Sequence, residues 1–212
     1  MISAREALEL LREGNRRFVA DRERGARVGA TRRNELTERQ EPFAIVLGCS
    51  DSRVPAEIVF DQGLGDLFVI RVAGNIVAPS QIGSVEFAAE QFHTRLVVVL
   101  GHSGCGAITA TVEQLKRPVE KQSRNLRAIV DRVRPSVEPL LATPLRDDLP
   151  ALIRDAVRAN VRASAGHLRH GSELLEQLID HDGLLVVGAE YSLDTGVVEF
   201  FEGLPPGHDA RR

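Results

Sequence analysis

Four runs of apolar residues are spread along this chain, at 43–48, 67–71, 96–101 and 184–188. Each run is continuous rather than alternating, which is typical of strands buried on both faces of a sheet. Segments with helical spacing of apolar residues separate them, most clearly at 80–93, 104–116 and 150–180. A further helix is expected at 122–133, followed by a loop. This alternation predicts an α/β fold with a mostly parallel central β-sheet flanked by helices.

The two ends of the chain carry different patterns. Residues 4–19 predict an amphipathic helix, because apolar side chains recur at helical spacing and Ser3 with Glu6 matches a capping box. With a short helix expected at 32–40, residues 1–41 would form an N-terminal helical arm. Residues 191–200 predict a hairpin that adds a C-terminal edge strand, and 203–212 a loose tail. We therefore expect residues 1–212 to form a single domain.

Composition excludes several classes of function. Hydrophobic residues make up 43% of the 212 positions and charged residues 27%, as in ordinary globular proteins. The net charge is −3, which disfavours the concentrated basic surface that nucleic-acid binding needs. We find neither a stretch of the ~20 apolar residues that would span a bilayer nor an N-terminal signal peptide. Because only two cysteines occur, a disulfide scaffold is excluded and a cytoplasmic location is expected.

The same Leu-Gly step ends two of the predicted strands. Cys49 follows this step in the first strand, and His102 follows it in the third, with Cys105 three residues later. Ligands of open α/β sheets bind beyond the carboxyl ends of the strands. Thiolate and imidazole are ligands that Zn²⁺ prefers, so these side chains predict a zinc site that uses both cysteines.

The predicted site has the character of a catalytic centre. Three protein ligands leave a fourth position open, whereas structural zinc sites usually close with four Cys or His. Asp51 and Arg53 follow Cys49 in the sequence Cys-x-Asp-x-Arg, which brings a carboxylate and its guanidinium partner beside the metal. Such a carboxylate can accept a hydrogen bond from a metal-bound group without being a ligand itself.

Each of these residues also has a simpler interpretation. Cys49 and Cys105 could be ordinary buried cysteines, or a disulfide, which the expected cytoplasmic location disfavours. His102 could be a core histidine, and Asp51 with Arg53 a structural ion pair. Together, at two strand ends, the residues favour the metal site, because the simpler interpretations would need several coincidences.

These motifs resemble those of the β-class carbonic anhydrases. The resemblance rests on Cys49-Ser-Asp-Ser-Arg53 and His102-Ser-Gly-Cys105-Gly. It extends to 54–58, 65–71, Gly74-Asn75, the N-terminal 7–18 and the C-terminal 188–196. It implies one Zn²⁺ per chain, held by Cys49, His102 and Cys105, and a catalytic pair formed by Asp51 and Arg53. The implied reaction is the reversible hydration of CO₂ to bicarbonate and a proton by zinc-bound hydroxide.

The resemblance also implies a substrate pocket. Gln40 corresponds by position to a substrate-binding glutamine of one branch of the family. Phe68 and Phe87 correspond to apolar pocket residues of that branch, and Gly106 to a residue whose backbone N–H can contact substrate.

One departure indicates the branch. Val46 stands where another branch has a tryptophan that helps to form a non-catalytic bicarbonate site, and this chain has no tryptophan. The sequence therefore resembles the open-site, plant-type branch, with Asp51 still available as a fourth zinc ligand at low pH. The implied partners are CO₂ and bicarbonate, with neither nucleic acid nor a membrane. The implied assembly is a homodimer with active sites near the subunit interface, or a tetramer built from two dimers.

Two other functions fit the same residues. A relative could hydrolyse CS₂ or COS at the same zinc site. Alternatively, the chain could be a non-catalytic, zinc-containing regulatory protein that binds bicarbonate. The pair Asp51 and Arg53, together with Gln40, argues against the second alternative, because a binding protein has no need to orient a nucleophile.

Overall fold

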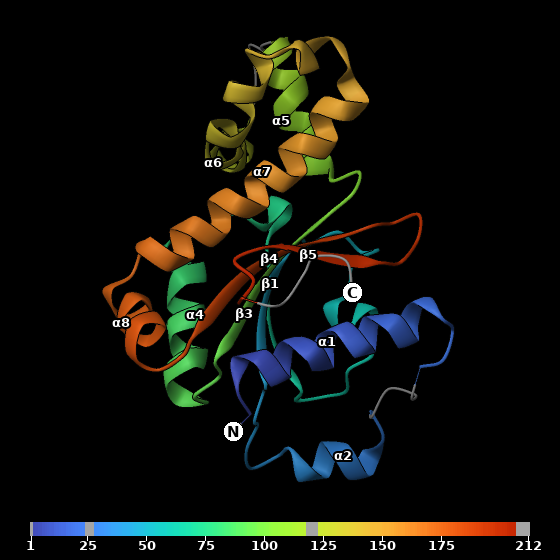
Figure 1. Cartoon of the computed structure of the whole chain (residues 1–212), viewed down its shortest axis with the longest axis vertical. Coiled ribbons are helices and arrows are strands. Elements are labelled where there is room, and N and C mark those ends of the chain that lie inside the picture. Colours follow the sequence, from blue (N-terminus) through green and yellow to red (C-terminus); the bar gives the residue numbers. More distant parts are fainter. Residues whose placement is uncertain (1, 24–27, 118–122, 207–212) are drawn as a thin grey trace.

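The computed structural model describes residues 2–23, 28–117 and 123–206, and it confirms the predicted α/β fold (Figure 1). Five strands form one sheet in the order β2-β1-β3-β4-β5. Strands β1 to β4 pair in parallel, and β5 pairs antiparallel with β4 as the predicted edge strand. The bounds are Ala44–Gly48 for β1, Leu67–Arg71 for β2, Leu96–His102 for β3, Leu185–Tyr191 for β4 and Val198–Glu202 for β5.

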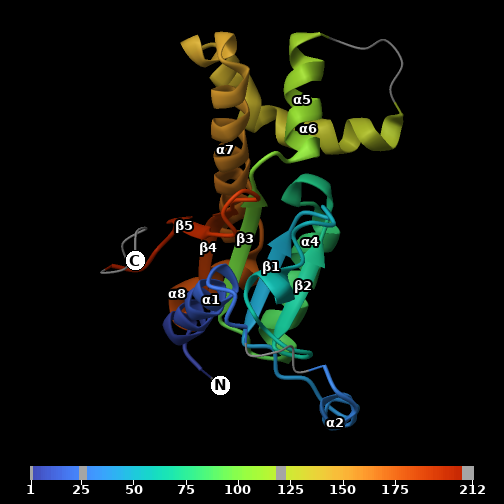
Figure 2. The same ribbon diagram turned by 90° about the vertical axis from the view of Figure 1, so that its right-hand side faces the viewer.

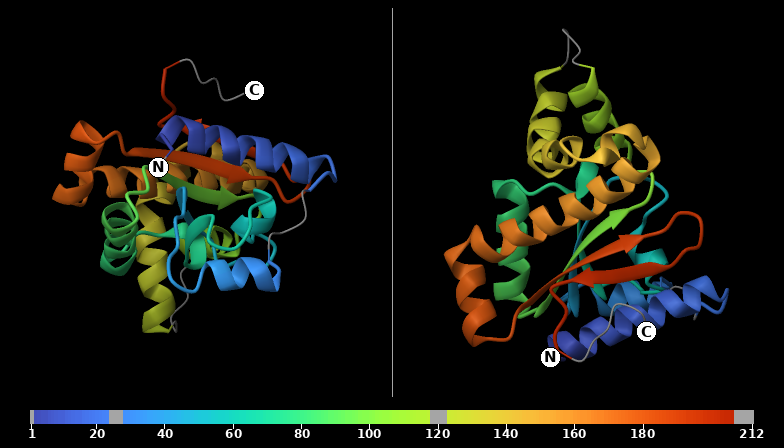
Figure 3. Two further views of the ribbon diagram at one scale, coloured as in Figure 1. Left: turned by 90° about the horizontal axis from the view of Figure 1, so that it is seen from below. Right: turned by 45° about the horizontal axis from the view of Figure 1, so that its top comes forward.

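Helices bury both faces of the sheet, which explains the continuous apolar runs. Along β1, Ala44 and Val46 belong to one hydrophobic cluster, and Ile45 and Leu47 belong to the other. The first cluster includes helices α1 (Ala4–Val19) and α3 (Ala56–Val59). The second includes α4 (Pro79–Gln91), α7 (Leu149–His170) and α8 (Glu173–His181). Figure 3, left, shows α1 and α4 on opposite sides of the strands.

A third group of helices lies beyond the carboxyl ends of the parallel strands. Helices α5 (Gly106–Lys116) and α6 (Arg124–Leu141) pack there with the first half of α7 (Figures 1 and 2). Their shared apolar cluster includes Cys49 and Cys105. The short helix α2 (Ala30–Glu35) lies at the opposite end of the molecule (Figure 2). The carboxyl edge of the sheet is therefore covered by packed helices, which gives a site at this edge a buried setting.

Two glycines let α7 pack closely against the sheet. A Cβ atom at Gly101 in β3 would lie 2.5 Å from a methyl group of Val161, and one at Gly188 in β4 would lie 2.7 Å from the other methyl group. Such distances are too short for real contacts, so a larger residue at either position would push the helix away. The Leu-Gly step that precedes His102 therefore serves packing as well as the site.

Most predicted elements are confirmed. Three predicted helices, 150–180, 122–133 and 32–40, differ from the observed ones. The predicted helix 150–180 is two helices, because the chain breaks at Gly171 and the hydroxyl of Ser172 caps α8 by accepting the Leu175 N–H at 3.2 Å. Helix α6 extends beyond the predicted end at 133, and it includes Pro135 and Pro139 because its apolar face continues to pack. Its predicted first residue, 122, lies outside the described residues.

The N-terminal arm and the C-terminal hairpin were predicted with different success. Helix α2 covers 30–35 instead of 32–40, and 36–40 do not continue it. Helix α1 has the predicted capping box of Ser3 and Glu6. The hairpin between β4 and β5 turns where expected, with Gly196 at φ +74°. Of the predicted tail, residues 207–212 lie outside the described residues.

Candidate metal centre

Three elements bring the predicted ligands together at the carboxyl edge of the sheet. Cys49 directly follows β1, His102 is the last residue of β3, and Cys105 is the N-cap residue of α5. Strands β1 and β3 are paired neighbours, so their ends lie side by side. All three side chains are buried, with exposed fractions of 5%, 0% and 1%. The order of the sheet therefore places Cys49 beside His102 and Cys105, which follow it by more than fifty positions in sequence.

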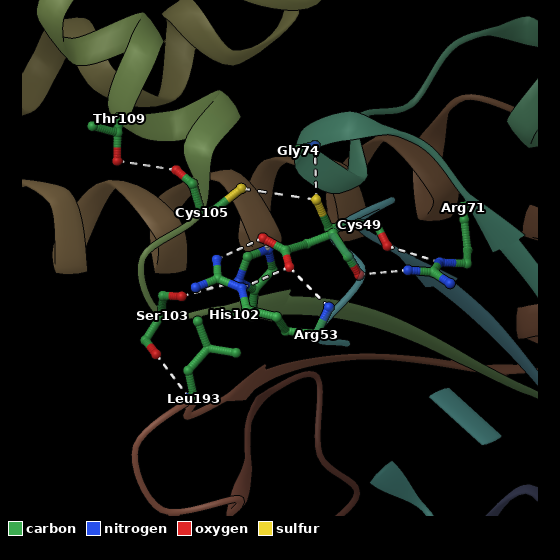
Figure 4. A network of polar contacts seen from close by, with 10 residues as sticks. Cys49, Arg53, Arg71, Gly74, His102, Ser103, Cys105, Thr109 and Leu193 are labelled. Atoms are coloured by element: carbon green, nitrogen blue, oxygen red, sulfur yellow. Dashed lines mark hydrogen bonds and ion pairs between the residues drawn. The ribbon is translucent and has the colours of Figure 1, made fainter. Parts of the chain in front are cut away.

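The ligand atoms of these three residues converge on one point (Figure 4). They lie within 4.8 Å of one another, and the two sulfur atoms are 4.0 Å apart. A tetrahedral zinc ion with Zn–S bonds of about 2.3 Å needs sulfur atoms roughly 3.8 Å apart. The donor set and its spacing therefore fit a zinc ion.

The imidazole of His102 is oriented for metal binding. Its Nδ1 lies 2.9 Å from the carbonyl oxygen of Ser103, which fixes Nδ1 as the protonated nitrogen. Its Nε2 is buried and has no hydrogen-bond partner among the described residues. A buried, unpaired nitrogen is costly, and a metal ion would satisfy it.

The two cysteine sulfur atoms lie within hydrogen-bond distance of each other. The hydrogen bond between their sulfur atoms lowers the pKa of Cys49 to about 4 and raises the pKa of Cys105. One thiolate is thus already stabilised in the buried site. A bound cation would displace the remaining proton and hold both sulfurs as thiolates.

Asp51 and Arg53 form a tight pair beside the three ligands. The Arg53 side chain donates from Nε to Oδ1 of Asp51 at 2.9 Å and from Nη2 to Oδ2 at 2.7 Å, and its backbone N–H also donates to Oδ1 at 3.0 Å. These bonds hold the pKa of the Asp51 carboxyl well below its ordinary value. Oδ2 of Asp51 lies 3.9 Å from Nε2 of His102. An ionised carboxylate therefore stands next to the convergence point.

Arg71 also holds this loop, a role that the sequence reasoning missed. At the end of β2 it donates from Nε to the Cys49 carbonyl oxygen at 3.0 Å and from Nη2 to the Asp51 carbonyl oxygen at 2.5 Å (Figure 4). Two carbonyl groups of the ligand loop are thereby fixed. The sequence feature that could have indicated this role is a charged residue at the end of an otherwise apolar strand.

The structure brings only one of the four predicted substrate-binding residues to the ligands of its own chain. Gly106 is adjacent to Cys105, as the first residue of α5. Gln40 precedes β1, whereas Cys49 follows it. The five residues of this strand, at about 3.3 Å each, place its beginning roughly 17 Å from its end, so Gln40 lies far from the ligands of its own chain.

Phe68 and Phe87 also lie away from the ligands of their own chain. Phe68 pairs with Ile45 near the start of both strands, three positions before the strand end that lies beside Cys49. Its ring packs 6.2 Å from that of Phe87 on α4, which is 51% exposed.

The fold and the buried Cys-His-Cys group define an α/β protein with a candidate metal site, and comparisons with known proteins identify its family. The model of the family described as "Carbonic anhydrase" matches residues 44–198. A carbonic anhydrase of Mycolicibacterium smegmatis is 40% identical over 193 residues, which cover 91% of each chain. Carbonic anhydrase 2 of Mycobacterium tuberculosis is 38% identical over 190 residues, which cover 90% of this chain and 89% of that one.

Solved structures agree. The β-carbonic anhydrase CafA of Aspergillus fumigatus superposes with a TM-score of 0.72 at 25% identity, covering 82% of this chain and 81% of that one. The β-carbonic anhydrase CcaA gives a TM-score of 0.72 at 25% identity and 93% coverage of both chains. The chain belongs to the β-class of the carbonic anhydrase family, the enzymes that hydrate CO₂. Within the part of the chain that the structure describes, every helix is too short or too polar to cross a membrane.

Proposed function

We propose that this chain catalyses the zinc-dependent, reversible hydration of CO₂ to bicarbonate and a proton at the centre formed by Cys49, His102 and Cys105. The observation that carries the proposal is the convergence of two buried sulfur atoms and an unpaired imidazole nitrogen beside an ionised carboxylate. Zinc, when bound by these three side chains, would lower the pKa of a water molecule and so supply hydroxide from neutral into alkaline pH.

Asp51 would orient the nucleophile. Its ionised carboxylate can accept a hydrogen bond from the attacking hydroxyl group and so turn a lone pair toward the carbon of CO₂. Arg53 would keep Asp51 ionised and correctly placed, because its guanidinium group already donates to both carboxylate oxygens. This pairing supports the open-site arrangement, with Asp51 on Arg53. At low pH we expect Asp51 to be able to leave Arg53 and occupy the fourth metal position.

Gly106 would contribute to the binding of bicarbonate. It lies at the N-terminus of α5, where backbone N–H groups are free of partners within the helix and favour an anion. Its N–H would stabilise the oxygen atoms that gain negative charge as bicarbonate forms.

Gln40, Phe68 and Phe87 would act on the site of a partner subunit. The sheet separates Gln40 from the ligands of its own chain, and Phe87 is half exposed in an aromatic cluster with Phe68 and Phe92. An exposed aromatic cluster is typical of an interface. We therefore propose a homodimer in which these residues complete the neighbouring pocket, or a tetramer of two such dimers. The similar β-carbonic anhydrases of Sordaria macrospora are described as tetrameric.

Metal analysis combined with a stopped-flow assay of CO₂ hydration tests the proposal. Purified protein should contain one zinc ion per chain, and it should accelerate the release of protons from dissolved CO₂. Parallel assays with CS₂ and COS distinguish the alternative hydrolase. Zinc-containing protein that binds bicarbonate without turnover would instead indicate a regulatory protein, and a chain without bound metal would refute the proposal. The cytoplasmic location and the single domain remain predictions.

A further inference from the structure

A turn after β2 contacts one of the proposed metal ligands. This turn, Ala73–Asn75, has two consecutive residues in the left-handed region, Gly74 at φ +71° and Asn75 at φ +42°. The backbone N–H of Gly74 donates to the sulfur of Cys49 at 3.4 Å (Figure 4). Asn is, after Gly, among the residues that best tolerate the left-handed region, so the sequence Gly74-Asn75 suits this turn.

Helix α7 supplies two side chains that hold this turn. Asn160 donates from Nδ2 to the Gly74 carbonyl oxygen at 2.8 Å, and Ser164 donates from Oγ to the Asn75 carbonyl oxygen at 2.9 Å. The two residues lie one helical turn apart and are 2% and 3% exposed. Two buried polar side chains on one face of a helix thus bond to consecutive carbonyl groups of the turn that reaches Cys49.

We propose that Asn160 and Ser164 are positioning residues of the metal centre. They hold the Ala73–Asn75 turn so that the Gly74 N–H points at the Cys49 sulfur. This hydrogen bond withdraws electron density from the thiolate and fixes the direction of its lone pairs, two means by which surrounding groups tune a metal–sulfur site. The inference rests on the proposed zinc centre and adds residues that touch neither the metal nor the substrate.

A purely structural role predicts something different. If Asn160 and Ser164 only stabilise the packing of α7, their loss should lower stability and leave the electronic state of the Cys49 sulfur unchanged. The test therefore needs a signal that comes from the metal–sulfur bonds themselves. Cobalt(II) in place of zinc provides one, because its thiolate-to-metal charge-transfer absorption shifts to lower energy when the sulfur becomes richer in electrons.

The experiment compares full-length Asn160→Ala and Ser164→Ala with a control variant, Leu168→Ala. Leu168 is fully buried in the same helix, eight residues after Asn160 and four after Ser164, and its apolar side chain forms no hydrogen bond, so its truncation removes packing of α7 and keeps both hydrogen bonds to the turn. Each protein is loaded with cobalt(II) for absorption spectra, and its zinc affinity is measured by competition with a chromogenic chelator. Thermal melting of the same samples shows how far each variant is destabilised.

We expect the charge-transfer band of Asn160→Ala to move to lower energy and its zinc affinity to fall by about tenfold, as for other outer-shell partners of metal ligands. Ser164→Ala should change both quantities in the same direction by less, and it decides the test alone if Asn160→Ala does not fold. Leu168→Ala should leave both at the wild-type values. Spectra and affinities that match those of Leu168→Ala would overturn the positioning role. Wild-type protein that binds neither metal would instead refute the zinc centre itself.

Discussion

The sulfur atoms of Cys49 and Cys105 lie 4.0 Å apart, although 56 positions separate the two residues in sequence. One sulfur belongs to the residue that follows β1 and the other to the N-cap residue of α5, which comes after β3, so the pairing of these two strands creates the contact. Their hydrogen bond lowers the pKa of Cys49 and raises the pKa of Cys105, and a bound cation would favour the deprotonated form of both. The contact therefore links the topology of the sheet to the affinity for a metal.

Removal of one sulfur ligand should abolish metal binding. In Cys105→Ala we expect the zinc content to fall to background and the melting temperature to drop, because a folded state that binds metal is stabilised by it. Metal analysis and thermal melting check this, with chelator-treated wild-type protein as the reference. A Cys105→Ala protein that retains one zinc ion per chain would exclude Cys105 from the ligand set.

Replacement of the carboxylate beside the metal should separate catalysis from metal binding. In Asp51→Asn we expect the zinc content to stay at the wild-type level and kcat to fall by about 10²-fold or more, because the amide cannot orient the nucleophile as the ionised carboxylate does. A matched control is Asp131→Asn, which removes an exposed carboxylate paired with Arg134 on α6 at 3.4 Å. Stopped-flow assays should find the control unchanged, and zinc loss in Asp51→Asn would make Asp51 a ligand instead.

The central layer of the fold was predictable because its physical signal is local. Runs such as 43–48 and 96–101 are apolar without alternation, and only a strand covered on both faces accounts for them at that length. The repeated Leu-Gly step then indicated which residues share an edge, so Cys49 and His102 could be placed together. Where one helix ends and the next begins was less predictable, because the break at Gly171 and the continuation through Pro135 depend on tertiary packing.

The supporting residues could not be predicted, because their roles depend on distant contacts. Asn160 bonds to Gly74 across 86 positions, and nothing near Asn160 in sequence indicates this. Arg71 was visible as a charge at a strand end, but its bonds to two carbonyl groups of the ligand loop needed the register of β1 and β2. The distance of Gln40 from the ligands could be inferred only once the direction of β1 was known, because Gln40 precedes this strand and Cys49 follows it. Sequence motifs thus identified the groups that would touch the metal, and the fold identified those that hold them.

The pH dependence should be set by the metal-held water and not by Asp51. Arg53 keeps the pKa of Asp51 well below its ordinary value, so this carboxylate is ionised in the folded and unfolded states above about pH 5. The stability that it contributes is lost as the pH falls from the ordinary carboxyl pKa to its lowered folded-state pKa. Two thiolates neutralise both charges of Zn²⁺, so the water should have a pKa above the ~7 found with three neutral histidines.

We therefore expect kcat to rise from neutral into alkaline pH, while the zinc content stays constant over the same range. Stopped-flow measurements between mildly acidic and alkaline pH check this. A flat profile would contradict the charge argument, and NMR titration of the Asp51 carboxyl group near neutral pH would assign the transition to that group instead.

Mixed dimers should reveal whether Gln40 serves the neighbouring subunit. If Gln40 acts across a two-fold interface, a hybrid of one Gln40→Ala chain and one Asp51→Asn chain has one intact site and one doubly defective site. Such a hybrid, purified with two different affinity tags, should regain about half of the wild-type activity, well above the mean of its two parents. If Gln40 serves its own chain, both sites of the hybrid are defective, and its activity should equal the mean of the parents. Full activity of Gln40→Ala homodimers would remove Gln40 from the substrate pocket altogether.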